Sequence, residues 1–327
     1  MISLGSDSPL YLLPFDHRHS YLTGMFHISP PLTKEQRQAV IDSKRVIYDG
    51  FREALVGGVP SDLAGILVDE EFGADILLDA SRNGYVTAVS TEKSGSEEFE
   101  FEYGDAFAQH IEIFQPTFAK ALVRYNPEGD SALNERQTIR LKRLSDYCRR
   151  AGQKFMFELL VPATTTQLVG AGGLTRYDRH IRPALMLETI RALQDAGVEP
   201  DIWKVEGLDS PHDCERVVET ARRDGRDEVG CIVLGHGADE RMVRSWLQIA
   251  ASVRGFIGFA VGRTTFWSPI ADFLAKKITR EEAALRIARR YGEWAAIFER
   301  ARCPEASLVE TEGGSLSKQP TGSGELE

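Results

Sequence analysis

The chain has 327 residues, of which 42% are hydrophobic and 27% charged, and its formal net charge is -10 at pH 7. This length allows one large domain, such as an α/β barrel of about 250 residues with insertions. Acidic and basic residues are interspersed, which disfavours nucleic acid or an anionic membrane surface as the main partner.

The amino-terminal segment "MISLGSDSPLYLLPFDHRHS" lacks a basic region followed by a long apolar run, so we expect no signal peptide. No segment approaches the roughly 20 apolar residues that are needed to cross a bilayer. The four cysteines show no CxxC pairing, which favours reduced, structural thiols. We therefore expect a cytoplasmic protein.

Short apolar runs bounded by turn residues predict eight β-strands. They are residues 11–16, 63–69, 86–92, 118–125, 154–162, 201–207, 231–237 and 256–263.

Segments with apolar residues at helical spacing predict helices between these strands. They are residues 33–57, 71–84, 105–114, 134–152, 183–197, 211–225 and 238–253, and two more, 268–277 and 279–302, follow the last strand.

This alternation predicts a single (β/α)8 TIM barrel over residues 1–303, with an extra C-terminal helix and a disordered tail over residues 304–327. A doubly wound open sheet is the alternative, but it usually has fewer strands and a glycine-rich phosphate loop after the first. Here the first strand leads to "DHRHS" instead.

Three charged residues stand alone among apolar neighbours on consecutive predicted strands. Lys120 lies on the fourth strand, Glu158 on the fifth and Lys204 on the sixth. Sequential strands of a barrel are neighbours, so we expect Glu158 to stand between the two lysines. The cluster either fills the barrel as satisfied ion pairs or forms a reactive site, and the crowding of polar groups at this rim favours the reactive site.

A lysine in this setting suits Schiff-base formation with a carbonyl substrate. An ordinary lysine, with a pKa of about 10.4, is protonated at neutral pH, but burial and a nearby cation such as Lys120 lower that pKa. We expect Lys204 to be the nucleophile, with Glu158 or Asp16 moving protons. This chemistry is that of a class I aldolase, which needs no metal or other cofactor.

The loops after strands seven and eight carry a predicted phosphate site, since glycine N–H groups and a cation bind phosphate there in many barrels. The residues are Gly235, Gly237, Gly262 and Arg263. Other rim residues predicted to bind substrate are Arg18, Glu92 and Arg124. Glu206 shares a strand face with Lys204, and we expect it to pair with a rim cation such as Arg18.

His17, His19 and His236 raise the alternative of a class II aldolase with a zinc-bound enolate. The spacing of two residues within "DHRH" and the lack of an obvious third ligand disfavour that metal site. Residues 170–180, after strand five, are interpreted as either a lid or a flexible loop without a catalytic role.

Several motifs resemble those of one known group of enzymes. In chain order they are "LPFDHR", "VDEEFG", "EKSG", "FAKALVRYNPEGD", "FELL", "WKVEG" and "VGRTTFW", and they span roughly residues 10–302. Together they resemble the class I aldolase family that includes tagatose-bisphosphate aldolase. The sequence is more similar still to the 5-dehydro-2-deoxyphosphogluconate aldolase-like domain found at the C-terminus of bacterial inositol-catabolism kinases.

The resemblance implies the same roles for Lys204, Glu158, Lys120 and Asp16, and it matches Gly262 and Arg263 to the phosphate-binding pair. Tagatose-bisphosphate aldolase has "YYD" after strand four where this chain has "VRYNPEGD", so Arg124 is expected to meet a second anionic group. The end of strand seven, "GHGAD", also differs from the family's serine-containing loop, and the kinase half is absent.

The substrate implied by the resemblance is 5-dehydro-2-deoxygluconate 6-phosphate, cleaved to dihydroxyacetone phosphate and malonate semialdehyde in inositol catabolism. Tagatose bisphosphate and sulfofructose phosphate would suit the same lysine chemistry. A non-catalytic barrel that binds a sugar phosphate is an alternative of another class, since fold and binding do not establish turnover. We also expect a homo-oligomer, as is common for such barrels.

Overall fold

The structure, a computed structural model, describes residues 8–302. Its strands are β1 (Leu10–Pro14), β2 (Ala64–Val68), β3 (Val86–Ser90), β4 (Phe118–Arg124), β5 (Lys154–Leu160), β6 (Ile202–Glu206), β7 (Gly230–Leu234) and β8 (Phe256–Ala260). Each strand pairs in parallel with the next, and β8 pairs with β1 to close the barrel. The predicted (β/α)8 TIM barrel is therefore confirmed, with every predicted strand present.

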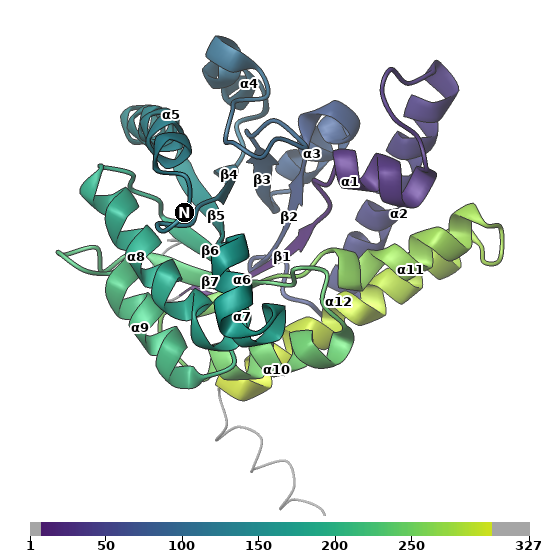
Figure 1. Ribbon diagram of the computed structural model, residues 1–327. Helices are drawn as coiled ribbons and strands as arrows, with labels where there is room; N and C mark the ends of the chain where they lie inside the picture. Colours follow the sequence, from purple (N-terminus) through teal and green to yellow (C-terminus); the bar gives the residue numbers. More distant parts are fainter. Residues whose placement is uncertain (1–7, 303–327) are drawn as a thin grey trace, which may run out of the picture.

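Helices alternate with the strands and form the outer layer of the barrel, as Figure 1 shows. They are α1 (His19–Tyr21), the π-helix η1 (Leu22–Phe26), α2 (Lys34–Val56), α3 (Glu70–Arg82), the 3-10 helix η2 (Gly104–Ala106), α4 (Phe107–Phe114), α5 (Ser131–Ala151), α6 (Thr165–Ala171), α7 (Leu174–His180), α8 (Arg182–Asp195), α9 (Pro211–Ala221), α10 (Glu240–Ala251), α11 (Arg263–Leu274) and α12 (Arg280–Arg302).

The helices begin where their sequences supply a cap. The side chain of Thr33 accepts a hydrogen bond from the Gln36 N–H and the Gln36 side chain accepts one from the Thr33 N–H, which forms a capping box at the start of α2. Asp69 caps α3 and Asp239 caps α10 in a similar way, each accepting from a backbone N–H three residues later. Asp69 directly follows β2, so its cap fixes the point at which the chain turns from that strand into α3.

The predicted extra helix is α12, which packs against α2, α10 and α11 on the outside of the barrel (Figure 1). Its Tyr291 is fully buried and donates a hydrogen bond to the carbonyl of Tyr11 on β1, at 2.7 Å. Trp294 is also fully buried. The last helix thus joins the end of the domain to its first strand.

A separate apolar cluster fills the lower interior of the barrel. It takes residues from all eight strands: Leu10, Leu12, Leu67, Val86, Ala88, Phe118, Met156, Ile202, Ile232, Ile257 and Ala260. Side chains two residues apart on a strand share a face, so Phe118 and Lys120 both point inward, as do Met156 and Glu158. The interior therefore changes from apolar to charged within one pleat.

The structure corrects two of the predicted segments. Residues 170–180 are not a flexible loop: α7 lies there, and its buried Tyr177 donates a hydrogen bond to the carbonyl of Val161 at 2.9 Å. The helix predicted from Ser268 begins five residues earlier, at Arg263. Pro269 therefore lies inside α11 and not in its first turn. The tail predicted to be disordered, residues 304–327, lies outside the described residues.

No helix within residues 8–302 is both long and apolar enough to span a membrane.

Candidate functional site

A cavity of about 320 Å³ opens at the carboxyl-terminal ends of the strands. Every residue predicted for the site lines it: Asp16, Arg18, Glu92, Lys120, Arg124, Glu158, Lys204, Gly235, Gly237, Gly262 and Arg263. The strand ends of the closed barrel thus bring together residues that are up to 247 positions apart in the sequence, from Asp16 to Arg263.

Lys120 lies at the centre of three carboxylates. Its Nζ is 2.8 Å from Asp16, 2.7 Å from Glu92 and 2.9 Å from Glu158. The lysine side chain is 1% exposed, so these contacts replace nearly all of its hydration. A buried charge is tolerated when it is paired in this way.

Glu158 also contacts the second lysine. Its other carboxylate oxygen is 2.7 Å from Nζ of Lys204, and the two residues are direct partners in the register of β5 and β6. Glu158 therefore lies between the two lysines, as expected. Among the described residues, Lys204 has this one carboxylate partner whereas Lys120 has three, so Lys204 is the less constrained amine.

The charges of this cluster shift one another's pKa values. Burial alone would lower the pKa of Lys120, but Asp16, Glu158 and Glu92 together raise it well above its usual range. Lys120 is therefore held as a cation near neutral pH.

The carboxylates respond in different ways to the same environment. Burial opposes ionisation of Asp16 and Glu158, but neighbouring lysines outweigh it and lower the pKa of both. Burial prevails at Glu92, with a further contribution from the negative charge of Asp16, and the pKa of Glu92 is raised. Glu92 is thus the carboxyl group of this set that most readily keeps a proton.

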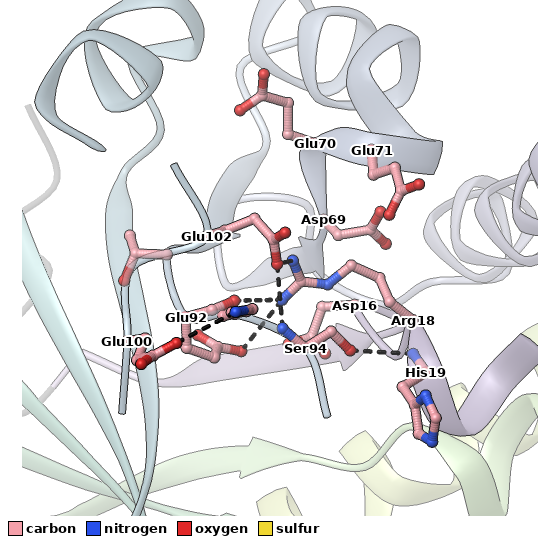
Figure 2. Close-up of polar contacts among 12 residues, drawn as sticks. Asp16, Arg18, His19, Asp69, Glu70, Glu71, Glu92, Ser94, Glu100 and Glu102 are labelled. Atoms are coloured by element: carbon pink, nitrogen blue, oxygen red, sulfur yellow. Dashed lines mark hydrogen bonds and ion pairs between the residues drawn. The ribbon is translucent and has the colours of Figure 1, made fainter. Parts of the chain in front are cut away.

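Arg18 holds the ends of β1 and β3 together (Figure 2). Its guanidinium donates to the Glu92 carbonyl and to the Glu102 carboxylate, both at 2.6 Å. The His19 N–H donates to Oγ of Ser94 between the same two segments, at 3.0 Å. Arg18 lines the cavity, but protein groups already occupy much of its donor capacity.

The expected pair between Arg18 and Glu206 is wrong. Glu206 instead accepts a hydrogen bond from the Val161 N–H at 2.9 Å, and lies 2.8 Å from Nδ1 of His236 and 3.7 Å from Arg182. Arg18 follows β1, and Glu206 ends β6. Because β7 and β8 lie between β6 and β1 in the closed barrel, the two side chains meet different partners.

His236 has an unusual backbone conformation, with φ at 50°. Left-handed conformations are costly for residues other than glycine and persist where the surroundings hold them. Here the buried carboxylate of Glu206 holds the imidazole, which is half-exposed at the cavity mouth. This pair is not apparent from the sequence, because His236 lies in the turn after β7, where strand alternation does not predict the direction of a side chain.

Two glycines of the predicted phosphate site are closely packed against neighbouring groups. Gly237 has φ at 71°, and a Cβ there would lie 2.7 Å from the guanidinium carbon of Arg263. A Cβ on Gly262 would lie 2.1 Å from the Pro14 carbonyl oxygen. Both positions thus require glycine.

Arg263 stands at the amino-terminal end of α11, where helix N–H groups favour an anion. In the described part of the chain no carboxylate forms a salt bridge with it. Burial lowers the pKa of Arg263, although Glu158 and Asp16 oppose that effect. A desolvated guanidinium of this kind is well suited to bind an anionic ligand.

Arg124 supplies a second guanidinium from the end of β4. It donates to the Ser96 carbonyl at 3.3 Å and lines the cavity with the loop that follows β3. Arg124 and Arg263 belong to strand ends that are not adjacent in the barrel. The cavity therefore has guanidinium groups from two separate strand ends.

The three histidines weighed as metal ligands all line the cavity. Over residues 8–302, no three His, Cys, Asp or Glu side chains form a group that suits a metal ion. The nearby carboxylates converge on the ammonium group of Lys120 instead.

Many solved structures match this fold, among them the following two. The crystal structure of Cgl0159 from Corynebacterium glutamicum has a TM-score of 0.54 and 16% identity, and the match covers 89% of this chain and 88% of that one. Fructose-bisphosphate aldolase from Slackia heliotrinireducens has a TM-score of 0.52 and 11% identity, with 85% of each chain covered. At these identities the likeness shows the barrel fold alone.

Comparison with curated proteins found no matching sequence. A family model does match, over residues 6–302, which is nearly the same span as the described barrel. The chain therefore belongs to the family described as "Uncharacterized protein conserved in bacteria (DUF2090)".

Proposed function

We propose that the protein is a class I aldolase that forms a Schiff base with its substrate through Lys204. The observation that carries this proposal is a buried amine at the floor of a polar cavity, 2.7 Å from a carboxylate that also contacts a second lysine. An amine nucleophile needs a neighbouring group that takes its proton, and Glu158 is in position to do so.

The first steps of the reaction use this pair. Glu158 takes a proton from the Lys204 ammonium, and the neutral amine then attacks the substrate carbonyl carbon. A proton shift gives a carbinolamine, and Glu158 returns its proton to the hydroxyl group, which leaves as water. The products are a protonated imine on Lys204 and one water molecule, so that charge and protons balance.

The imine draws electrons from the neighbouring carbon. A hydroxyl group on the next carbon gives its proton to the carboxylate of Glu158 or Asp16, and its oxygen forms an aldehyde. The electrons of the broken C–C bond form an enamine with the Lys204 nitrogen, and water hydrolyses the imine once the enamine carbon has regained a proton. Lys120, held as a cation by three carboxylates, stabilises negative charge that develops beside it. Asp16 and Glu158 are the groups proposed to return a proton to the enamine carbon.

The proposed substrate is a phosphorylated keto sugar acid. Arg263 with Gly235, Gly237 and Gly262 is suited to the phosphate, and Arg124 to the carboxylate. The best candidate is 5-dehydro-2-deoxygluconate 6-phosphate, cleaved to dihydroxyacetone phosphate and malonate semialdehyde. The sequence resemblance supports this choice, and the likeness of the fold to a fructose-bisphosphate aldolase supports aldolase chemistry more generally.

A substrate panel tests this proposal. The purified protein is assayed with 5-dehydro-2-deoxygluconate 6-phosphate, tagatose 1,6-bisphosphate and sulfofructose 1-phosphate, and release of the three-carbon product is followed by a coupled NADH assay. We expect the keto acid to be cleaved with the highest kcat/KM and activity to persist in a strong chelator. Arg124→Gln should raise KM for the keto acid.

Two other outcomes would change the proposal. Preference for tagatose bisphosphate or sulfofructose phosphate would keep the chemistry and correct the substrate. Tight binding of these compounds without cleavage of any would favour a sugar-phosphate-binding barrel.

A further inference from the structure

His17 lies in the cavity but has no role in the mechanism described above. It follows Asp16 at the end of β1, and its ring packs edge-on against Phe266 of α11, with ring centroids 5.9 Å apart. Its Nδ1 is buried, and it has no hydrogen-bond partner among residues 8–302. An unpaired buried polar atom costs free energy, and the residue that carries this one lines the cavity, so a ligand atom could supply the missing partner.

The charges around His17 determine its protonation state. Burial lowers the pKa of His17 to about 4; Arg263 and Lys204 act in the same direction, while Asp16 and Glu158 oppose them. The imidazole is therefore neutral near pH 7 and has one N–H to donate. His17 lines the same cavity as the proposed nucleophile Lys204 and the proposed phosphate-binding Arg263.

Imine formation needs a partner for the substrate oxygen. As Lys204 attacks, the carbonyl oxygen gains negative charge and then becomes a hydroxyl group that leaves as water. Asp16 is held on Lys120 as an ionised carboxylate, which cannot donate a hydrogen bond, and Glu158 carries a proton only after it has taken one from Lys204 and must then give it up to the departing hydroxyl group. A neutral imidazole can polarise a carbonyl without giving up its proton.

We propose that His17 is a catalytic residue that donates a hydrogen bond to the substrate oxygen displaced by Lys204, an inference that rests on the Schiff-base reaction proposed above. The proton transferred in this step still travels from Lys204 through Glu158 to the departing hydroxyl group. His17 keeps its own proton, so the balance of the step is unchanged, and the hydrogen bond strengthens as charge builds on the oxygen.

The test measures the rate of imine formation directly. Dihydroxyacetone phosphate is mixed with the protein, samples are quenched with borohydride at short times, and the reduced adduct is measured by intact mass. His17→Phe should slow imine formation by on the order of 10²-fold, the usual effect of removing one such donor. His17→Gln, which keeps an N–H donor, should recover most of the rate.

Two controls separate a lost hydrogen bond from a damaged site. Thermal unfolding shows whether each variant folds, and inhibition by inorganic phosphate shows whether the Arg263 site is intact. The proposal predicts that both variants bind inorganic phosphate as wild type does.

Failure of the proposed role of His17 and failure of the Schiff-base proposal give different results in this experiment. Imine formation at the wild-type rate in His17→Phe, or an equal loss in both variants, would overturn the role of His17 and leave the Schiff-base proposal standing. No adduct on the wild-type protein would contradict the Schiff-base proposal itself, and the role of His17 with it.

Discussion

The two halves of the barrel interior share the same strands and the same strand faces but differ in chemistry. Phe118, Met156 and Ile202 belong to the apolar cluster in the lower half. Two residues further along the same strands are Lys120, Glu158 and Lys204, which belong to the charged cluster of the upper half. The apolar half stabilises the barrel, while the charged half holds groups that stability alone would not select.

Burial therefore has different consequences for the apolar and the charged side chains of the same barrel interior. Met156 is fully buried and Lys120 is 1% exposed, yet removing the first leaves a cavity and removing the second leaves unpaired charges. Variants in the two halves should therefore separate stability from activity.

The largest expected effect comes from removing the proposed nucleophile. Lys204→Arg keeps a positive charge beside Glu158 but cannot form an imine, so activity should fall on the order of 10⁴-fold or more. The free energy of unfolding should change little, since the ion pair persists. Steady-state kinetics and urea unfolding check the two parts, and a variant that keeps more than a tenth of the activity would contradict the assignment.

Removing the central cation, Lys120, should lower both the stability and the activity of the protein. Lys120→Met leaves three carboxylates buried without their shared partner, which should lower the free energy of unfolding by about 3–5 kcal/mol. Activity should also be lost, because Glu158 then pairs with Lys204 alone. Urea unfolding of this variant beside Lys204→Arg makes the comparison, and equal stability of the two would show that the three contacts of Lys120 contribute little.

A truncation in the apolar half should lower the stability of the fold and leave substrate binding unchanged. Met156→Ala should lower the free energy of unfolding by about 2–5 kcal/mol, the usual range for such a truncation in a core. The folded fraction should keep the wild-type KM, because Met156 lies below the charged groups. A raised KM with unchanged stability would break the distinction between the halves.

The smallest expected effect is a dependence of stability on acid. The folded-state pKa values of Asp16 and Glu158 are lowered, so their contribution is present above the unfolded values of about 4 and is lost as pH falls below them. The raised pKa of Glu92 acts in the opposite direction and offsets part of this loss. Urea midpoints at pH 7 and near pH 3 should show the decline, and it should be shallower in Lys120→Met.

The sequence was sufficient to predict all the strands because each is an apolar run bounded by turns. It also identified Lys120, Glu158 and Lys204, because a single charge in a buried strand needs a partner on the neighbouring strand. Residues 170–180 were harder, since the glycines of "GAGG" obscure the short helices on either side.

Contacts made by residues in the turns after the strands were not predictable from the sequence. The partner of Glu206 is His236 at the end of the next strand, and this pairing depends on the left-handed turn at His236. His17 was considered only as a metal ligand, because no sequence pattern shows that its Nδ1 is buried without a partner. Such facts arise from packing, after the fold has formed.

The Schiff-base proposal is tested most directly by identifying the lysine that reacts. The protein is reduced with borohydride in the presence of dihydroxyacetone phosphate, digested, and mapped by peptide mass spectrometry. We expect the adduct on Lys204 in the wild type and no adduct in Lys204→Arg. An adduct on Lys120 or another lysine, or none on the wild type, would contradict the assignment of Lys204 as the nucleophile.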